Sequence, residues 1–176
     1  RVLDGGLTKW KLEQRSVSDQ QTAYTPAQLT TTPRTGLMAS KEEVLTAINN
    51  SKVCTINALR RAQHAGQDDG EFGNYGRPGH ISGSVNVPTI ELVDSNTTTF
   101  LPAEHNASLF TEISVVKAEC ILTYCCGGMA AFVTAMLFFM SGFDIVPLYH
   151  AALSDWLPYN TTPIDLLNYP PTPQTT

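Results

Sequence analysis

Cys120-Ile121-Leu122-Thr123-Tyr124-Cys125-Cys126-Gly127-Gly128-Met129-Ala130-Ala131-Phe132 is the stretch that decides the fold. Its first half, residues 120–124, is almost wholly apolar, which is typical of a strand at the centre of a parallel sheet. A pair of glycines then breaks the strand, and the apolar run 131–139 predicts a buried helix. Cys125 is thereby placed at the carboxyl end of a strand, where ligands of parallel sheets bind.

The small residues after Cys125 are suited to a tight loop whose backbone amides point inward. The start of the following helix adds its positive dipole end. Such a cradle favours the thiolate and would stabilise an anion without any basic side chain. We therefore interpret Cys125 as a catalytic nucleophile. The loop residues predicted to bind substrate are Cys126, Gly127, Gly128, Met129, Ala130 and Ala131.

Other segments extend this pattern on both sides. Ser40 and Glu43 form a capping box that starts a helix, and residues 53–56 read as a buried strand. Further strands are predicted at residues 81–88 and 145–149. Strands that alternate with helices indicate an α/β fold, with a central parallel sheet and helices on both faces.

Composition excludes several classes of protein. The formal net charge is −5, so a general nucleic-acid binder, which needs a basic face, is not expected. The most apolar run, Ala130–Met140, is too short for a bilayer, which needs about 20 apolar residues. We predict neither nucleic-acid nor membrane partners.

The cysteines do not form a disulfide framework in this interpretation. Three of the 4 cysteines crowd into residues 120–126, around an apolar strand. The histidines show no ligand spacing relative to them, so no metal site is predicted. A reducing compartment fits free thiols, and we expect a cytoplasmic or mitochondrial protein.

The chain divides into three parts by composition. Residues 1–36 read as the remnant of a preceding domain plus a linker rich in Ser, Gln, Thr and Pro. Residues 37–160 carry the α/β pattern and are predicted to be the main domain. Residues 161–176 are rich in Pro and Thr and are predicted to be a C-terminal tail.

Four motifs in this order resemble those of the rhodanese family of sulfurtransferases. Cys125, Gly128 and Ala131 are similar to the family's Cys-x-x-Gly-x-x-Ala active loop. Residues 79–88 resemble its Gly-His-Ile-x-Gly-x-x-Asn-x-Pro element, in which we expect His80 to hold the loop. The third motif, Tyr149 with Ser154-Asp155-Trp156, resembles the end of a rhodanese domain. The fourth, Arg1-Val2-Leu3-Asp4-Gly5-Gly6 with Trp10, resembles the same ending in a preceding domain.

The resemblance implies the C-terminal, catalytic half of a tandem thiosulfate or 3-mercaptopyruvate sulfurtransferase. Cys125 would take the outer sulfur of a small donor as a persulfide and pass it to a thiol or to cyanide. It also implies that no cofactor is needed, and that a missing N-terminal rhodanese domain is a partner.

The chain departs from the family pattern around the substrate. Asn57-Ala58-Leu59 stands where the family has Asp-Ala-Arg, so Arg60 and Arg77 become the candidates for binding an anionic donor. The active loop carries no basic residue, and His150-Ala151-Ala152 replaces the family's Asp-Gly-Ser.

Two other functions fit parts of the sequence. A phosphatase of related fold would need an arginine to close the loop, which instead ends Met129-Ala130-Ala131. A regulatory or protein-binding module with weak activity would explain the departures, although it would not need the Cys125 loop. Cys126 either intercepts an oxidised Cys125 or serves as a small loop residue.

Overall fold

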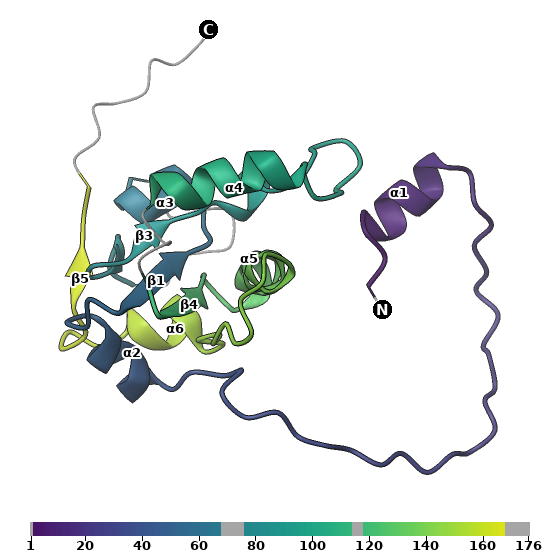
Figure 1. The fold of residues 1–176 in the computed structure, drawn as a ribbon, viewed down its shortest axis with the longest axis horizontal. Helices are drawn as coiled ribbons and strands as arrows, with labels where there is room; N and C mark the ends of the chain where they lie inside the picture. Colours follow the sequence, from purple (N-terminus) through teal and green to yellow (C-terminus); the bar gives the residue numbers. More distant parts are fainter. Residues whose placement is uncertain (1, 68–75, 114–117, 168–176) are drawn as a thin grey trace, which may run out of the picture.

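The computed structural model describes residues 2–67, 76–113 and 118–167 (Figure 1). Its elements are α1 (Gly6–Leu12), α2 (Lys41–Ala47), β1 (Val53–Asn57), α3 (Arg61–Ala65), β2 (His80–Ile81), β3 (Val85–Asn86), the 3-10 helix η1 (Thr89–Glu91), α4 (Ala103–Glu112), β4 (Cys120–Tyr124), α5 (Met129–Met140), α6 (Ala152–Trp156) and β5 (Ile164–Asp165). The predicted strand before the cysteine and the predicted apolar helix after it are both present, as β4 and α5.

A parallel sheet of order β3-β1-β4 lies at the centre. The predicted strand at 145–149 is shorter than expected, because only Leu148 makes parallel bridges, to Thr123 on one side and Met38 on the other. Pro147, which has no amide hydrogen to donate, limits this ladder. All these segments run in one direction, so their carboxyl ends share one edge of the sheet.

Both faces of the sheet are covered. Neighbouring residues of a strand point to opposite faces, and Ile121 and Leu122 of β4 belong to different core clusters. On the Ile121 side, Phe110 of α4 and Phe138 of α5 stack with ring centroids 4.1 Å apart. On the Leu122 side, Trp156 of α6 is fully buried. The predicted α/β fold with helices on both faces is confirmed.

Helix α2 starts as the capping box predicts. The Ser40 hydroxyl accepts the Glu43 amide, and the Glu43 carboxylate accepts the Ser40 amide. This pairing satisfies two backbone donors at the helix start and directs the apolar Val44 side chain into the core.

The predicted C-terminal tail begins later than residue 161. Thr162 is buried, and β5 pairs antiparallel with β2, with His80 opposite Asp165. The amide of Leu167 donates to the carbonyl of Ala65. Residues 161–167 thus belong to the domain, because they cover backbone donors and acceptors that β2 would otherwise expose; residues 168–176 lie outside the described residues.

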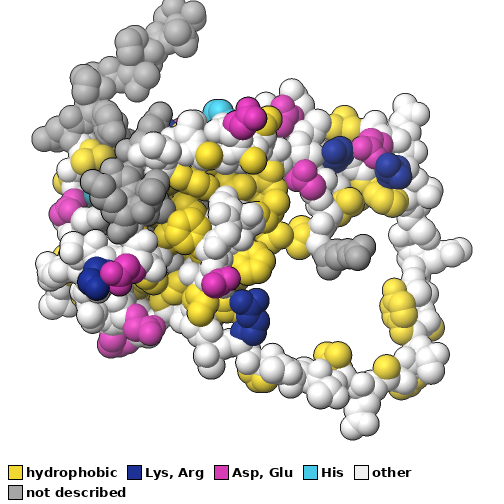
Figure 2. Space-filling view, viewed as in Figure 1, with side chains coloured by type: hydrophobic (Ala, Val, Ile, Leu, Met, Phe, Trp, Pro, Cys, Tyr) yellow, Lys and Arg dark blue, Asp and Glu magenta, His cyan; other side chains and the backbone are white. Residues whose placement is uncertain are grey.

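The N-terminal segment lies beside the domain rather than within it. Helix α1 is joined to α2 by an exposed connection without regular structure over residues 15–34 (Figure 1). The Phe100 amide donates to Asp4 and the Thr98 hydroxyl donates to the Gly5 carbonyl, so residues 4–5 touch the domain at one loop. Figure 2 shows hydrophobic side chains gathered on the neighbouring face of the domain. Within the described residues, no helix combines the length and the apolar character needed to cross a bilayer.

Two buried histidines join α3 to β2. The rings of His64 and His80 stack with centroids 3.7 Å apart, and His80 Nδ1 donates to the His64 carbonyl oxygen at 2.6 Å. The expectation that His80 holds its loop is confirmed. In the described part of the chain, His64 Nδ1 has no hydrogen-bond partner. Burial, reinforced by the charges on His80 and Arg61, lowers the pKa of His64 from 6.5 to about 3.

This pair predicts a loss of stability in mild acid. The unfolded chain takes up a proton at His64 near pH 6.5, whereas the folded chain takes it up only near pH 3. The free energy of unfolding is therefore highest above pH 6.5 and falls toward pH 3, by at most about 1.4 kcal/mol per pH unit. Urea unfolding between pH 7 and pH 4.5 measures this slope. His64→Gln should flatten it, whereas His105→Gln, which changes an exposed histidine, should not; equal slopes in all three proteins would contradict the assignment to His64.

Candidate active site

Cys125 lies at the carboxyl end of β4, and neighbouring segments hold its backbone. The Ala58 amide donates to the Tyr124 carbonyl at 2.9 Å, which fixes the end of β4 against the end of β1. The amides of Leu153 and Ser154 in α6 donate to the carbonyls of Cys125 and Cys126 at 3.1 and 3.0 Å. Cys125 itself is only 2% exposed. The end of β4 is thus held by the segment after β1, and both cysteines of the loop are held by α6.

Tyr124 anchors the strand from the other side of the sheet. Its buried hydroxyl accepts the Ile81 amide at 3.0 Å and lies 2.7 Å from the Ser84 hydroxyl. Burial raises the pKa of Tyr124, so the phenol stays protonated and can donate to Ser84. The residues of the Gly-His-Ile element therefore support the strand that carries Cys125.

The loop turns at Gly128. This residue has a φ of +88°, and a Cβ added to it would lie 2.9 Å from Cδ2 of His150 and 3.0 Å from the His150 carbonyl oxygen. Only glycine suits both conditions. Gly127 has no such neighbour, since nothing lies within 4 Å of a Cβ added there. Helix α5 begins directly after this turn, so its free amides lie next to the loop.

The remaining predicted loop residues have distinct surroundings. Ala131 is fully buried and packs in one cluster with Cys125 and Ala58. The Ala130 carbonyl accepts the Thr89 hydroxyl at 3.0 Å. Met129 is 78% exposed, and Cys126 is half-buried. The loop is thus closed on its inner side and open at Met129.

The other two cysteines lie away from this loop. Burial raises the pKa of Cys54 to about 11 and also raises that of Cys120. Both thiols stay protonated near neutral pH, so neither is a nucleophile. All four cysteines are free thiols, and the described residues contain no group of histidine, cysteine and acidic side chains that could hold a metal ion.

Arg60 lies beside the active loop. A small cavity of about 190 Å³ is lined by residues after β1, by η1 and by the active loop, including Arg60, Thr89 and Ala130. Asn86 places this segment, because its side-chain amide donates to the carbonyls of Asn57 and Leu59 at 2.9 and 2.8 Å. The asparagine of the Gly-His-Ile element therefore positions the segment that carries Arg60.

Arg77 does not join this cavity. Its guanidinium donates to the carbonyls of Leu157, Tyr159 and Thr162 and to the Thr162 hydroxyl. The guanidinium is thus used in fastening the segment after α6. This placement does not support the prediction that Arg77 binds substrate, because the C-terminal segment folds so that its backbone carbonyls accept the guanidinium hydrogens.

Separate consequences follow for the two arginines. Arg77→Leu should lower the free energy of unfolding by about 1.5–3 kcal/mol, since it leaves buried carbonyls without a charged donor. It should leave the half-saturating donor concentration unchanged. Arg60→Leu should instead leave the free energy of unfolding nearly unchanged and weaken the binding of an anionic donor. Urea unfolding and donor titration of both variants measure this contrast, and a binding defect in Arg77→Leu would contradict it.

Sequence patterns missed two neighbours of the loop. Thr89 contacts both Ala130 and Thr134 through its hydroxyl, at 3.0 Å each. His150 lies against Gly128 and edge-on to the Phe132 ring, with centroids 6.1 Å apart. No local motif around Thr89 marks this role. For His150, the replacement of an acidic residue after Tyr149 was a signal, although it did not indicate a contact with Gly128.

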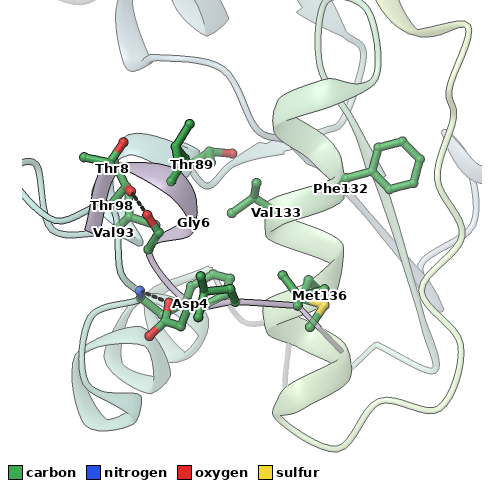
Figure 3. A pocket seen from close by; sticks show the side chains of 14 residues that line it. Asp4, Gly6, Thr8, Thr89, Val93, Thr98, Phe132, Val133 and Met136 are labelled. Carbon is green, nitrogen blue, oxygen red and sulfur yellow. Dashed lines mark hydrogen bonds between the residues drawn. The ribbon is translucent and has the colours of Figure 1, made fainter. Parts of the chain in front are cut away.

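A second, larger cavity lies between the N-terminal segment and α5. Its volume is about 590 Å³, and Val133 and Met136 of α5 face Asp4 and Gly6 across it (Figure 3). Thr89 lines both this cavity and the one at Arg60. The N-terminal segment therefore forms one wall of a largely apolar space that adjoins the candidate active site.

Comparison with curated proteins identifies sulfurtransferases. Thiosulfate sulfurtransferase of Rattus norvegicus is 24% identical over 155 residues, 88% of this chain and 52% of the relative. The 3-mercaptopyruvate sulfurtransferase of the same species is 26% identical over 155 residues, with the same coverage. A relative in Mycolicibacterium smegmatis, which bears the name thiosulfate sulfurtransferase, is 28% identical over 137 residues, 71% of this chain and 46% of the relative. The chain thus spans about half the length of the curated relatives it matches.

Solved structures share the fold. The anaerobic ergothioneine biosynthesis enzyme from Chlorobium limicola superposes with a TM-score of 0.82 at 15% identity, over 94% of this chain and 41% of that chain. A structure of the enzyme EanB that carries a cysteine persulfide also gives 0.82, at 14% identity over the same shares. No model of a known protein family matches the chain.

The chain folds as an α/β domain with a central parallel sheet, and this fold is similar to that of the sulfur-transferring enzymes named above. Its curated homologues are the thiosulfate and 3-mercaptopyruvate sulfurtransferases of the rhodanese family.

Proposed function

We propose that this chain transfers sulfane sulfur through a persulfide on Cys125. The observation that carries the proposal is the position of Cys125, at the end of a buried strand and under a loop that turns at Gly128 into α5. The names of the curated relatives support the same class of reaction.

The reaction has two steps. The Cys125 thiolate attacks the outer sulfur of thiosulfate or the thiol sulfur of 3-mercaptopyruvate. A sulfur–sulfur bond forms on Cys125, the S–S bond of thiosulfate or the C–S bond of 3-mercaptopyruvate breaks, and sulfite or the enolate of pyruvate leaves. A thiophile such as cyanide or a thiol then attacks the outer sulfur and releases the Cys125 thiolate. The loop amides and the start of α5 stabilise the persulfide anion, while the low exposure of Cys125 excludes water. Arg60 binds the anionic end of the donor from the neighbouring cavity.

Cys126 is a loop residue in this proposal. Its carbonyl accepts the Ser154 amide, and this bond places the chain that leads to Gly128. The half-buried position of its side chain is compatible with a protective role, in which its thiol attacks an oxidised Cys125 and forms a disulfide.

We also infer that residues 2–12 are the end of a preceding rhodanese-like unit. Val2, Leu3, Leu7 and Leu12 are each more than half exposed, as expected for side chains that pack against residues of such a unit. The length of the curated relatives, about twice that of this chain, supports this inference.

A donor comparison tests the proposed function. The chain is incubated with thiosulfate or with 3-mercaptopyruvate, cyanide is added, and thiocyanate is measured. Thiocyanate from either donor is the expected result, and the donor with the higher kcat/KM identifies the substrate. A folded chain that yields no thiocyanate and no persulfide from either donor would favour the alternative, a regulatory or protein-binding module.

A further inference from the structure

We propose that His150 is a specificity-determining residue that binds the anionic end of the sulfur donor. This inference rests on the proposed function and adds a residue to the same site. It starts from a deficit of charge: the active loop has no basic side chain, the chain carries a net charge of −5, and both donors considered above are anions. A hydrogen-bond donor at the loop mouth must therefore come from another segment.

Three other basic residues near the site, Arg61, Lys41 and Arg77, are engaged by partners of their own. Arg61 forms a bidentate pair with Glu91, at 2.7 and 2.5 Å. Lys41 pairs with Asp155 at 2.9 Å, and Arg77 is held by carbonyl groups after α6. Arg60 approaches the loop from the side of Ala130. His150 approaches from the side of Gly128, so the two residues flank the loop that covers Cys125.

Contacts with the active loop and with α5 hold His150 in place. Its ring carbon Cδ2 and its carbonyl oxygen lie 2.9 and 3.0 Å from the place of a Cβ on Gly128. The Phe132 ring packs edge-on against the imidazole. The segment that follows is attached to the loop, because the amides of Leu153 and Ser154 donate to the carbonyls of Cys125 and Cys126. Movement of the loop therefore carries His150 with it.

The imidazole of His150 has a donor to offer. The residue is exposed, so its ring nitrogens are accessible to a bound molecule. A ring N–H beside Gly128 can donate to a sulfonate or carboxylate oxygen whether the imidazole is neutral or protonated. Sulfite that leaves after transfer from thiosulfate would make the same contact.

Single-turnover loading isolates this contact. Persulfide on the chain is measured by mass spectrometry after mixing with increasing thiosulfate, without any acceptor, and sulfite is added as a product inhibitor. His150→Leu removes the donor, whereas His150→Gln retains an N–H group of similar reach. His105→Leu changes an exposed histidine of α4 and is the matched control.

His150→Leu is expected to raise the half-saturating thiosulfate concentration about tenfold, the effect of one hydrogen bond to an anion. The inhibition constant of sulfite should rise by a similar factor, and the maximal loading rate should change less than about twofold. His150→Gln should recover most of the affinity, and His105→Leu should match the parent. Should His150→Leu fail to fold, His150→Glu tests the same point and should weaken donor binding at least as much.

Two results would overturn the inference. One is unchanged affinity for thiosulfate and sulfite in both His150→Leu and His150→Glu. The other is an equal fall in the maximal rate in His150→Leu and His150→Gln with unchanged affinity, which would mean that the ring only packs against Gly128. Failure of the proposed function is a different result, since the parent chain would then form no persulfide, or Cys125→Ser would form it as readily as the parent.

Discussion

Cys125→Ser is expected to abolish persulfide formation and to lower thiocyanate production at least about a thousandfold. The hydroxyl of serine is not ionised near neutral pH, and it is a far weaker nucleophile toward sulfur than a thiolate. The change removes little volume from a residue that is 2% exposed, and the carbonyl of residue 125 still accepts the Leu153 amide. Activity should therefore be lost without loss of the fold.

Matched replacements show whether the effect belongs to Cys125. Cys120→Ser changes a half-buried thiol whose pKa is raised by burial and which lies at the far end of β4. It should leave persulfide loading within about twofold of the parent. Mass spectrometry counts the loaded sulfur, and circular dichroism checks the fold. A sulfur still loaded on folded Cys125→Ser would refute the role of Cys125.

Gly128→Ala is expected to give the second largest loss, at least about tenfold in the rate of persulfide loading. An alanine at a φ of +88° costs about 1–2 kcal/mol, and its Cβ would meet His150 at 2.9–3.0 Å. The backbone must move to relieve this contact, and a shift of about 1 Å at a reacting group can cost about a hundredfold in rate. The loop backbone around Cys125 would then no longer hold its present geometry.

Two other glycines separate the causes of this loss. Gly127→Ala alters the same loop with no neighbour within 4 Å of the new Cβ, and it should cost less activity. Gly142→Ala places alanine at a φ of +101° after α5, again with open space around it. It should lower stability and spare loading. The rate of persulfide loading in quenched reactions measures the effect on activity, and urea unfolding measures the effect on stability. Equal loading rates in Gly127→Ala and Gly128→Ala would contradict the role of the close approach to His150.

Persulfide formation and complete turnover differ in what they need from the rest of the protein. The proposed persulfide formation needs from the protein only Cys125 and its loop, both of which lie within this chain. We expect rapid turnover to depend also on the surroundings of the apolar cavity, one wall of which is the N-terminal segment. A chain that loads sulfur but discharges it slowly would therefore be consistent with a preceding unit that completes the site.

The sequence by itself determined the strand, the candidate nucleophile at its end and the turn after it. These features are local: an apolar run forms a buried strand, two glycines end it, and an apolar helix follows. The capping box at Ser40 was predictable for the same reason, whereas the supporting role of His80 was predicted from the motif it belongs to. The identity of Cys125 as the candidate nucleophile thus needed no knowledge of distant contacts.

Only the tertiary structure decided which charged and polar side chains reach the loop. Arg60 and Arg77 were equal candidates in the sequence, yet Arg77 bonds to Thr162, 85 positions away, while Arg60 lines the cavity at Ala130. The same holds for His150 beside Gly128 and for β5 on β2. Long-range pairs of this kind depend on how the elements pack, because no local preference of the chain places one segment against another.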